Sequence, residues 1–424
     1  MKKKRILLTV MLCVLAASAM CGCASGKDED KTESVSLKKL QTDSEDKQGN
    51  VSLKFWCDES EMSMFQQRID QFIEENKSEA SIEVICEPVA ASVCKDTFLA
   101  DTDNGADVFY LPDDQLLAMV TSGVLEEVAD ADKISGRSLE DAVAAASVDG
   151  KLYAYPITAD NGYFLYYDKR YFKEDDVQTL DRILDVCEEN GKKFAMTWSS
   201  GWYLYSFFGN TGLAMGVNDD GLTNHCEWNA KKGEIKGTDI AQGILDIAKH
   251  PGFQEADDET RVKMMEKGDA IAVVSGIWDA EIAKKAFGGD YGACKLPTYT
   301  CAGKQVQMSS FKGYRLLGVN SYSSHKEWAS KLADYLSGEE SQNFYFEKSQ
   351  HGPANRKAAS SDEINKVPAI AAVMEQAEYG ALQTVGQKFW TPTMTFGNTM
   401  AAGNPNNIPL QDLMDQLVSG ITES

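Results

Sequence analysis

The chain has 424 residues, of which 43% are hydrophobic and 25% are charged. This composition predicts a large globular body of two domains. The 65 acidic side chains outnumber the 42 basic ones, which gives a formal net charge of −23. Nucleic acid and anionic membrane surfaces would repel so acidic a protein, and both are therefore poor partners.

The first residues predict export. Residues 2–5 are basic and lead into an apolar stretch over residues 6–17, which is too short to cross a bilayer. Small residues then precede Cys23, as in the lipid-attachment box of bacterial lipoproteins. We therefore expect residues 1–22 to be a signal peptide, Cys23 to carry a lipid anchor on the extracytoplasmic face of the cell membrane, and the polar residues 23–50 to form a flexible tether. The alternative is a secreted protein in which this cysteine is incidental.

Seven cysteines follow Cys23, and their number and spacing leave two arrangements open. An odd number cannot all pair internally, and no Cys-x-x-Cys motif or Cys/His cluster indicates zinc. Local disulfides between Cys86 and Cys94 and between Cys294 and Cys301 are one arrangement, and buried free thiols are the other. The remaining three are Cys57, Cys187 and Cys226.

The globular body begins with alternating strands and helices. Residues 51–56 alternate between apolar and polar side chains, which predicts a strand, and residues 64–73 place apolar side chains at helical spacing. Two further strands are predicted at residues 81–85 and 107–111, with a helix between them and another after Asp113. Strands that alternate with helices predict a parallel sheet.

A second α/β unit is predicted after a crossing between the domains. Strand-like runs at residues 150–157 and 163–167 flank the polar segment 160–162, where we place the crossing. The second unit has predicted strands at 193–197 and 270–275, helices at 179–188, 238–248 and 257–266, and a turn at 219–221. Residues 314–319 predict a strand that returns to the first domain, and the chain from residue 363 onward is expected to be mainly helical.

The motifs that usually carry catalysis are missing. The sequence has no Walker phosphate loop, no dinucleotide glycine fingerprint, no Gly-x-Ser-x-Gly elbow and no His-Glu-x-x-His. Its histidines stand in polar surroundings, so we expect them to be exposed, and their spacing does not indicate a metal site; they are His225, His250, His325 and His351. We therefore predict a protein that is not an enzyme and that uses neither a metal nor a cofactor.

Aromatic residues stand beside carboxylates and amides in segments that should be loops after strands, the edge at which open α/β sheets bind ligands. Sugars present apolar C–H faces and hydroxyl groups, so a sugar site combines flat rings for stacking with Asp, Asn or Glu for hydrogen bonds. Any one of these tryptophans alone is better explained as a core residue. Together they predict a sugar site, and the segments are Trp56–Glu59, Tyr110–Asp114, Asp160–Asn161, Trp198–Tyr203, Gly276–Asp279 and Phe389–Trp390.

Short motifs in a fixed order support this interpretation. They are Gly105-Ala106-Asp107-Val108-Phe109-Tyr110, Ser122-Gly123-Val124-Leu125, Gly150-Lys151-Leu152-Tyr153-Ala154-Tyr155-Pro156, Tyr166-Tyr167-Asp168-Lys169, Lys267-Gly268-Asp269-Ala270 with Gly276-Ile277-Trp278, and Tyr291-Gly292-Ala293-Cys294-Lys295-Leu296-Pro297. The set spans about residue 51 to the end of the chain. Together these motifs resemble the extracellular solute-binding protein family 1, in its maltose/maltodextrin-binding branch.

The resemblance implies an α/β fold of the periplasmic-binding-protein type, with two lobes, a hinge and a ligand cleft between the lobes. Residues 51–161 and 309–358 would form the N-terminal lobe, and residues 162–308 and 359–424 the C-terminal lobe. The implied function is that of a monomeric substrate-binding component of an ABC importer, which captures an oligosaccharide and delivers it to permease subunits. Carried over by position, the cleft residues are Asp58, Glu59, Tyr110, Asp113, Asp160, Trp202, Tyr203, Trp278 and Trp390.

Three positions depart from the maltose-binding pattern. Asp114 stands where that pattern has an Arg, Gly201 near the place of a Glu, and Met394 at the place of a late Arg. Each change removes a polar contact, so the expected ligand is a sugar rather than maltose specifically.

Two other hypotheses remain. The same fold can bind a polyamine, a peptide or another small solute, or ferric ion through adjacent tyrosines such as Tyr166 and Tyr167. A secreted glycosidase would use paired carboxylates, and the many Asp and Glu residues form no recognisable acid/base motif.

Overall fold

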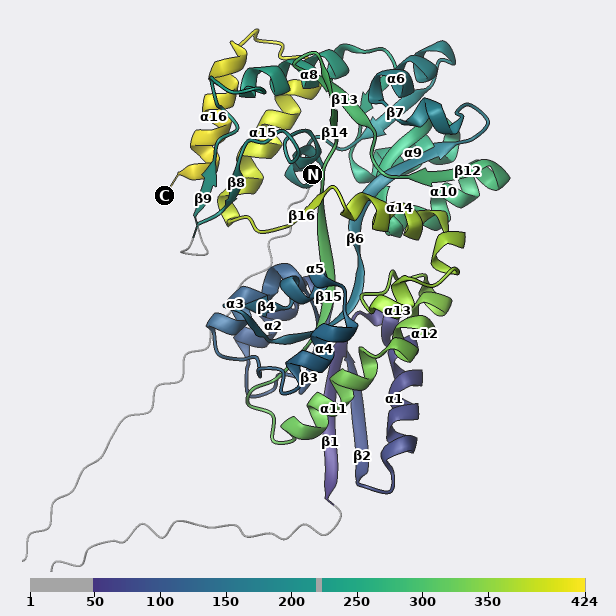
Figure 1. Ribbon diagram of the computed structural model, residues 1–424, viewed down its shortest axis with the longest axis vertical. Helices are drawn as coiled ribbons and strands as arrows, with labels where there is room; N and C mark the ends of the chain where they lie inside the picture. Colours follow the sequence, from purple (N-terminus) through teal and green to yellow (C-terminus); the bar gives the residue numbers. More distant parts are fainter. Residues whose placement is uncertain (1–48, 219–222, 424) are drawn as a thin grey trace, which may run out of the picture. The chain divides into compact units, whose positions relative to one another are not determined.

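The computed structural model describes residues 49–218 and 223–423, which Figure 1 shows as ribbons. The predicted signal peptide, Cys23, most of the tether and the predicted turn at 219–221 lie outside the described residues. Within the described part, no helix is both long and apolar enough to span a membrane. The seven cysteines from Cys57 onward are unpaired, and burial raises the pKa of the Cys94 thiol to about 12. The structure therefore has free thiols rather than local disulfides.

The first strands form a parallel unit. β1 (Asn50–Cys57) pairs in parallel with β2 (Ser81–Pro88) and with β3 (Val108–Pro112). The connections contain α1 (Met62–Asn76) and α2 (Cys94–Ala100). Phe65, Ile69 and Phe72 of α1 follow helical spacing, and all three are buried in one core with the apolar side chains of β1. The strands, the helices and the parallel order predicted for this segment are confirmed.

Two long antiparallel strands run through the centre of the main sheet. β6 (Ala154–Asp168) pairs with β15 (Ser310–Val319), β3 pairs with β15, and β11 (Ala270–Gly276) pairs with β6, all antiparallel. The sheet is therefore mixed, and the prediction of a parallel sheet was wrong for these strands. The reason is that β15 returns from the second unit and enters beside β3 in the opposite direction, which the alternation of strands and helices does not reveal.

The two strand-like runs predicted on either side of residues 160–162 meet in a single strand, β6. These polar residues lie inside one continuous strand. Residues 312–313 of β15 pair with them, and the Ala159 N–H donates to the Gly352 carbonyl at 2.7 Å. β15 pairs with this polar segment, and the backbone of the preceding Ala159 bonds to Gly352, so the strand continues through it.

The second unit follows the predicted alternation. β7 (Lys193–Met196) lies between β10 (Phe253–Glu255) and β11 and is parallel to both, while β12 (Tyr291–Cys294) pairs with β6. Its predicted helices are present as α6 (Leu180–Glu189), α8 (Gly237–Lys249) and α9 (Asp258–Lys267). The end of the chain is helical as predicted, with α14 (Pro368–Ala377), α15 (Trp390–Ala401) and α16 (Leu410–Thr422); the short β16 (Gly380–Leu382) interrupts it and pairs with β15.

Buried apolar side chains fall into separate groups along the chain. One core draws on residues 51–157 and 314–354. The other, with a smaller cluster, draws on residues 163–308, Phe311 and 369–421. β6 and β15 contribute to both. This distribution supports the lobe boundaries proposed from the sequence, which stay a prediction.

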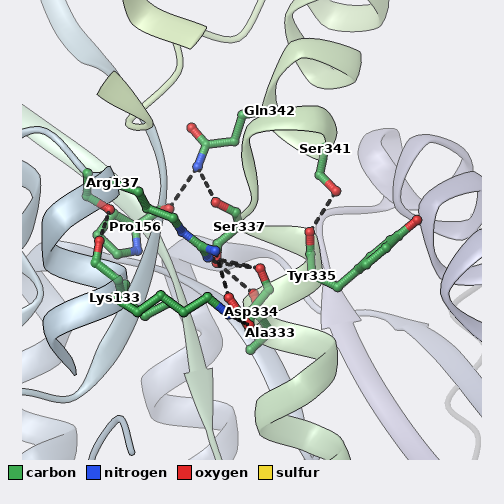
Figure 2. A network of polar contacts seen from close by, with 11 residues as sticks. Lys133, Arg137, Pro156, Ala333, Asp334, Tyr335, Ser337, Ser341 and Gln342 are labelled. Carbon is green, nitrogen blue, oxygen red and sulfur yellow. Dashed lines mark hydrogen bonds and ion pairs between the residues drawn. The ribbon is translucent and has the colours of Figure 1, made fainter. Parts of the chain in front are cut away.

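A polar network packs three helices against the start of β6 (Figure 2). Lys133 and Arg137 of α4 (Ala131–Arg137) form ion pairs with Asp334 of α11 (Lys326–Leu336) at 2.8 and 2.7 Å. Gln342 of α12 (Glu339–Ser349) is buried and donates to the Pro156 carbonyl in β6 at 3.0 Å. These contacts join α4 to α11 and tie α12 to the start of β6.

Candidate ligand-binding site

A cavity of about 180 Å³ lies where β3 ends and β6 and β15 run side by side. Its other walls come from the turn after β3, from the start of α7 (Gly201–Leu204), which follows β7 along the chain, and from the loop after β16. This is the edge of the sheet at which α/β proteins bind ligands. The lining residues are Ser92, Pro112, Asp113, Asp114, Gln115, Asn161, Trp202, Lys312, Gly313, Arg315 and Gln383.

Asp113 is the predicted carboxylate that lines this cavity. It follows the last residue of β3, and its Oδ1 accepts a hydrogen bond from the Tyr314 N–H at 2.9 Å. Burial, with the neighbouring charge of Asp114, raises the pKa of Asp113 to about 7, although the Tyr314 hydrogen bond and the positive charge of Arg315 oppose the rise. A carboxylate held in this way can accept hydrogen bonds from ligand hydroxyl groups.

Basic side chains line the same cavity. Arg315 follows a register shift in β15 after Gly313, an irregularity of the kind that re-aims side chains beside binding sites. Its guanidinium lies 6.0 Å from the ring centre of Tyr110, which is buried and is not a lining residue. Lys312 donates from Nζ to the Asp141 carboxylate at 2.5 Å. The cavity is thus polar and carries both signs of charge.

Gln115 and Asp58 hold the wall that carries Ser92. Gln115 is 8% exposed, and its Nε2 donates to the Ala91 and Ser92 carbonyls at 3.1 and 2.9 Å. Asp58 accepts a hydrogen bond at Oδ1 from the Ala91 N–H at 2.9 Å. Asp58 therefore supports the wall rather than lining it, and Glu59 is exposed and is not a lining residue.

Two tryptophans and a tyrosine form an aromatic wall, defined here as Tyr163, Trp202 and Trp278. The ring centres of Trp202 and Trp278 are 5.7 Å apart, and that of Tyr163 is 4.6 Å from Trp202. The Tyr163 hydroxyl also donates to the Trp202 carbonyl at 2.7 Å. Trp278 is 47% exposed, whereas a core tryptophan is buried. Its ring is therefore available for stacking beside the cavity that Trp202 lines.

Two of the predicted aromatic residues lie behind or away from the cavity. Tyr203 is 4% exposed, and its ring centre is 5.0 Å from that of Tyr163. Trp390 begins α15 and packs edge-on against the buried Phe389 at 5.0 Å. Neither lines the cavity.

Asp160 is buried and bonded at both oxygens. Oδ1 accepts from the Thr158 hydroxyl at 2.7 Å; Oδ2 accepts from the Gly352 N–H at 2.7 Å and lies 3.1 Å from Nδ1 of His351. Nε2 of His351 lies 3.0 Å from the Glu61 carboxylate. The structure therefore gives Asp160 a structural place in β6 and does not bring it to the cavity lining.

The expectation that the histidines are exposed was wrong for His351, because its side chain is only 18% exposed. Burial alone would lower its pKa, but the hydrogen bonds to Asp160 and Glu61 raise it to about 10. His250 and His325 are half-buried, and His225 is exposed as expected. Sequence spacing missed the His351 contacts because Glu61 and Asp160 are distant along the chain.

Residues 67–372 match the model of a family described as bacterial extracellular solute-binding protein. The chain belongs to this family. A galactooligosaccharide-binding protein of Bacillus subtilis (strain 168) is 26% identical to this solute-binding protein over 405 residues, which cover 93% of this chain and 91% of the relative. A maltooligosaccharide ABC transporter solute-binding lipoprotein of Streptococcus pneumoniae (strain ATCC BAA-255 / R6) is 26% identical over 330 residues, or 73% of this chain and 74% of the relative.

A solved structure confirms the predicted fold class. The maltodextrin-binding protein of L. casei BL23, solved without ligand, has a TM-score of 0.78 to the solute-binding protein at 22% identity, covering 89% of this chain and 100% of the other. The solute-binding protein therefore has the two-lobed α/β fold that its motifs indicated, and it belongs to the family they resembled.

Several residues that line the cavity of the solute-binding protein were not predicted. Asn161 belongs to a segment that the sequence had marked, Gln115 directly follows another, and Arg315 is the charged residue of the predicted strand 314–319, so each had a local signal. Lys312 and Gln383 had none. They reach the cavity only through the pairing of β15 with β6 and β16, which joins distant parts of the chain.

Proposed function

We propose that this solute-binding protein captures an oligosaccharide outside the cytoplasm and delivers it to the permease of an ABC importer. The observation that carries the proposal is the pair of tryptophans, Trp202 and Trp278, beside a cavity with carboxylate and amide side chains. Sugar rings have apolar C–H faces that stack on such indoles and hydroxyl groups that bond to carboxylates and amides.

The polar side chains of the cavity suit a neutral, hydroxyl-rich ligand. Asp113 can accept hydroxyl hydrogens, Arg315 and Lys312 can donate, and the amides of Asn161 and Gln383 can do both. Acidic and basic side chains line the cavity together, so the cavity does not select strongly for a ligand of either charge. This balance favours an oligosaccharide over a polyamine.

The relatives point to the same ligand class. One is named for galactooligosaccharides, and another for maltooligosaccharides and an ABC transporter. Of the sequence departures from the maltose-binding pattern, Asp114 lines the cavity. We infer that the ligand is an oligosaccharide that accepts an acidic group at this position.

We infer that the ligand stabilises a closed form. Asp113 and Arg315 of the cavity come from the part of the chain that builds one core, and Trp202 and Gln383 come from the part that builds the other, so a ligand there contacts both parts. The Gln383 side chain donates a hydrogen bond to the Asp114 carboxylate at 3.4 Å, which joins these two parts of the chain. A ligand that adds contacts only when both sides are close shifts the population toward the closed form.

The remaining parts of the proposal come from the sequence. Lipid on Cys23 would anchor the protein outside the cell membrane, and one of the relatives is named a lipoprotein. We propose that the chain acts as a monomer, binds without turnover and hands its ligand to permease subunits.

Ferric ion is a weaker alternative because the tyrosines that suggested it serve the core. Tyr166 is fully buried, and its hydroxyl donates to the Gly276 carbonyl at 2.9 Å. Tyr167 is also buried and packs edge-on against Phe172 at 6.3 Å. Neither lines the cavity.

The test is a thermal-shift screen with purified protein against gluco-, galacto-, xylo- and manno-oligosaccharides, with polyamines, peptides and ferric ion beside them, followed by calorimetry. A native-state ligand raises the melting temperature by mass action. We expect one oligosaccharide series to do so, and Trp202→Ala and Trp278→Ala to weaken its binding at least tenfold. Trp328→Ala, a half-buried tryptophan of α11 remote from the cavity, is the control. A response to a non-sugar alone, or conversion of the sugar to products, would reject the proposal.

A further inference from the structure

A buried arginine lies behind the aromatic wall. Arg261 of α9 is 1% exposed. Its Nη1 donates to the Thr197 hydroxyl at 2.8 Å and to Asp258 at 2.6 Å, and its Nη2 donates to the Ser275 hydroxyl and the Asp279 carboxylate, both at 3.1 Å. One guanidinium thus joins residues that follow or end β7 and β11, the two strands that lead into the aromatic wall.

Arg261 reaches Trp278 through its neighbour Asp279. Asp279 is 6% exposed and accepts hydrogen bonds from Arg261 and, at 2.6 Å, from the Ser275 hydroxyl. Trp278 stands between this fixed carboxylate and Gly276, where a Cβ would lie only 2.1 Å from the indole ring. The indole therefore rests directly over the Gly276 backbone, and Asp279 anchors the turn that carries it.

Arg261 reaches Trp202 through Tyr203. The guanidinium lies 5.3 Å from the centre of the Tyr203 ring, and that ring is 5.1 Å from Trp202 and 5.0 Å from Tyr163. The Tyr203 hydroxyl also bonds to Ser275. A planar cation with donors on several sides can hold a ring and two hydroxyl groups at once, which a lysine cannot do.

A buried charge is costly to desolvate, and an apolar side chain would fill the same space without that cost. Arg261 nevertheless meets two carboxylates and two hydroxyl groups, and one of these carboxylates, Asp279, directly follows Trp278 of the aromatic wall. We propose that Arg261 is a positioning residue, which holds Trp202 and Trp278 at the spacing that the ligand requires. The ligand part of this proposal rests on the proposed function, whereas the placement of the two rings does not.

The experiment uses Arg261→Lys, with Arg68→Lys as its matched control. Arg68 is 3% exposed, bonds Ser341 at 3.1 Å and lies 4.8 Å from the Tyr335 ring, in the other core. The full-length protein is labelled with 5-fluorotryptophan, and its seven tryptophans give resonances that are assigned with Trp202→Phe and Trp278→Phe. We expect both substitutions to lower the melting temperature. Only Arg261→Lys should shift or broaden the Trp202 and Trp278 resonances, and it should weaken binding of the oligosaccharide found by the screen at least tenfold.

Unchanged Trp202 and Trp278 resonances in folded Arg261→Lys would overturn the proposal. So would an equal disturbance in Arg68→Lys. If Arg261→Lys does not fold, Asp279→Asn is measured in its place, because the amide keeps the shape of the carboxylate. Asp279→Asn should shift the Trp278 resonance and leave the Trp328 resonance unchanged. If the wild-type protein binds no sugar, the proposed function fails, while the fluorine spectra still decide whether Arg261 positions the rings.

Discussion

Nδ1 of His351 lies 3.1 Å from Oδ2 of Asp160 and ties the segment after α12 to the middle of β6. On its other side the imidazole contacts Glu61. The imidazole ring therefore joins the turn after β1, the central strand β6 and the segment that follows α12. It lies where the first core meets β6, one of the two strands that contribute to both cores.

His351→Gln should destabilise the protein most at mildly acidic pH. The pKa of His351 is raised from 6.5 to about 10 by its carboxylate partners, so its stabilisation is complete below pH 6.5 and is lost as the pH rises toward 10. The pKa of Asp160 is lowered, so that carboxylate contributes above about pH 4. We expect a loss of about 3 kcal/mol at pH 6 and a clearly smaller loss at pH 9.5, measured by urea unfolding. His225→Gln, at an exposed position, should change neither value; an equal loss at both pH values would show that His351 is not charged.

Asp113→Asn should stabilise the free protein at alkaline pH. Because the pKa of Asp113 is raised to about 7, the folded state keeps a proton that the unfolded chain has lost, and wild-type stability falls between about pH 4 and pH 7. The amide can still accept the Tyr314 hydrogen bond. We expect a gain of roughly 1–2 kcal/mol at pH 8 and almost none near pH 4, together with weaker sugar binding.

The measurement for Asp113 is thermal unfolding across this pH range. Asp96→Asn, at a side chain that is 77% exposed, is the matched control. A stability profile of Asp113→Asn that parallels the wild type would contradict the prediction.

Gly276→Ala should weaken ligand binding at the aromatic wall more than it destabilises the fold. The new methyl group would lie 2.1 Å from the Trp278 ring, and the half-exposed indole can swing away at little cost in stability. We expect at least tenfold weaker sugar binding by calorimetry, with a change in unfolding free energy below about 1 kcal/mol. Gly289→Ala, where a Cβ meets nothing within 4 Å, should leave binding intact. If both variants bind equally well, Trp278 is not a ligand contact.

Gln342→Leu should destabilise the fold without changing the cavity. Gln342 is 1% exposed, bonds the Pro156 and Ser337 carbonyls and accepts from the Asn355 N–H at 2.7 Å. Leucine would leave these buried groups without a side-chain partner, at a cost of about 3 kcal/mol. Urea unfolding measures the loss, and Gln67→Leu, at an exposed position, is the control. A tenfold change in ligand affinity would show that the network of Figure 2 reaches the cavity.

The sequence predicted the helices and strands that depend on local patterns of apolar and polar residues. Period-two and period-3.6 patterns identified β1, α1 and α8, because each buries one face and exposes the other over most of its length. They divided this part of β6 into two runs because Asp160 is polar, while its bonds to Thr158 and Gly352 let it lie in the middle of one strand. The direction of β15 was equally invisible, since it depends on pairing with β3.

The sequence predicted those residues of the candidate site that have side chains suited to a sugar and that also lie in a motif directly after a strand. Asp113 and Trp202 each follow a strand and line the cavity. Tyr203 belongs to the same motif as Trp202, yet its ring is buried beside Tyr163, and Trp390 packs against the buried Phe389. Sequence shows which residues are adjacent along the chain, and it does not show which way each ring turns when two strands from distant positions meet.

The pairing of β3 with β15 has a consequence for how this protein is made. Leu111 meets Leu316 across the sheet, so the first core stays incomplete until most of the chain exists. Closing so long a loop is slow, because its entropy must be lost before the contact forms. A chain that cannot finish its first half early stays unfolded for longer.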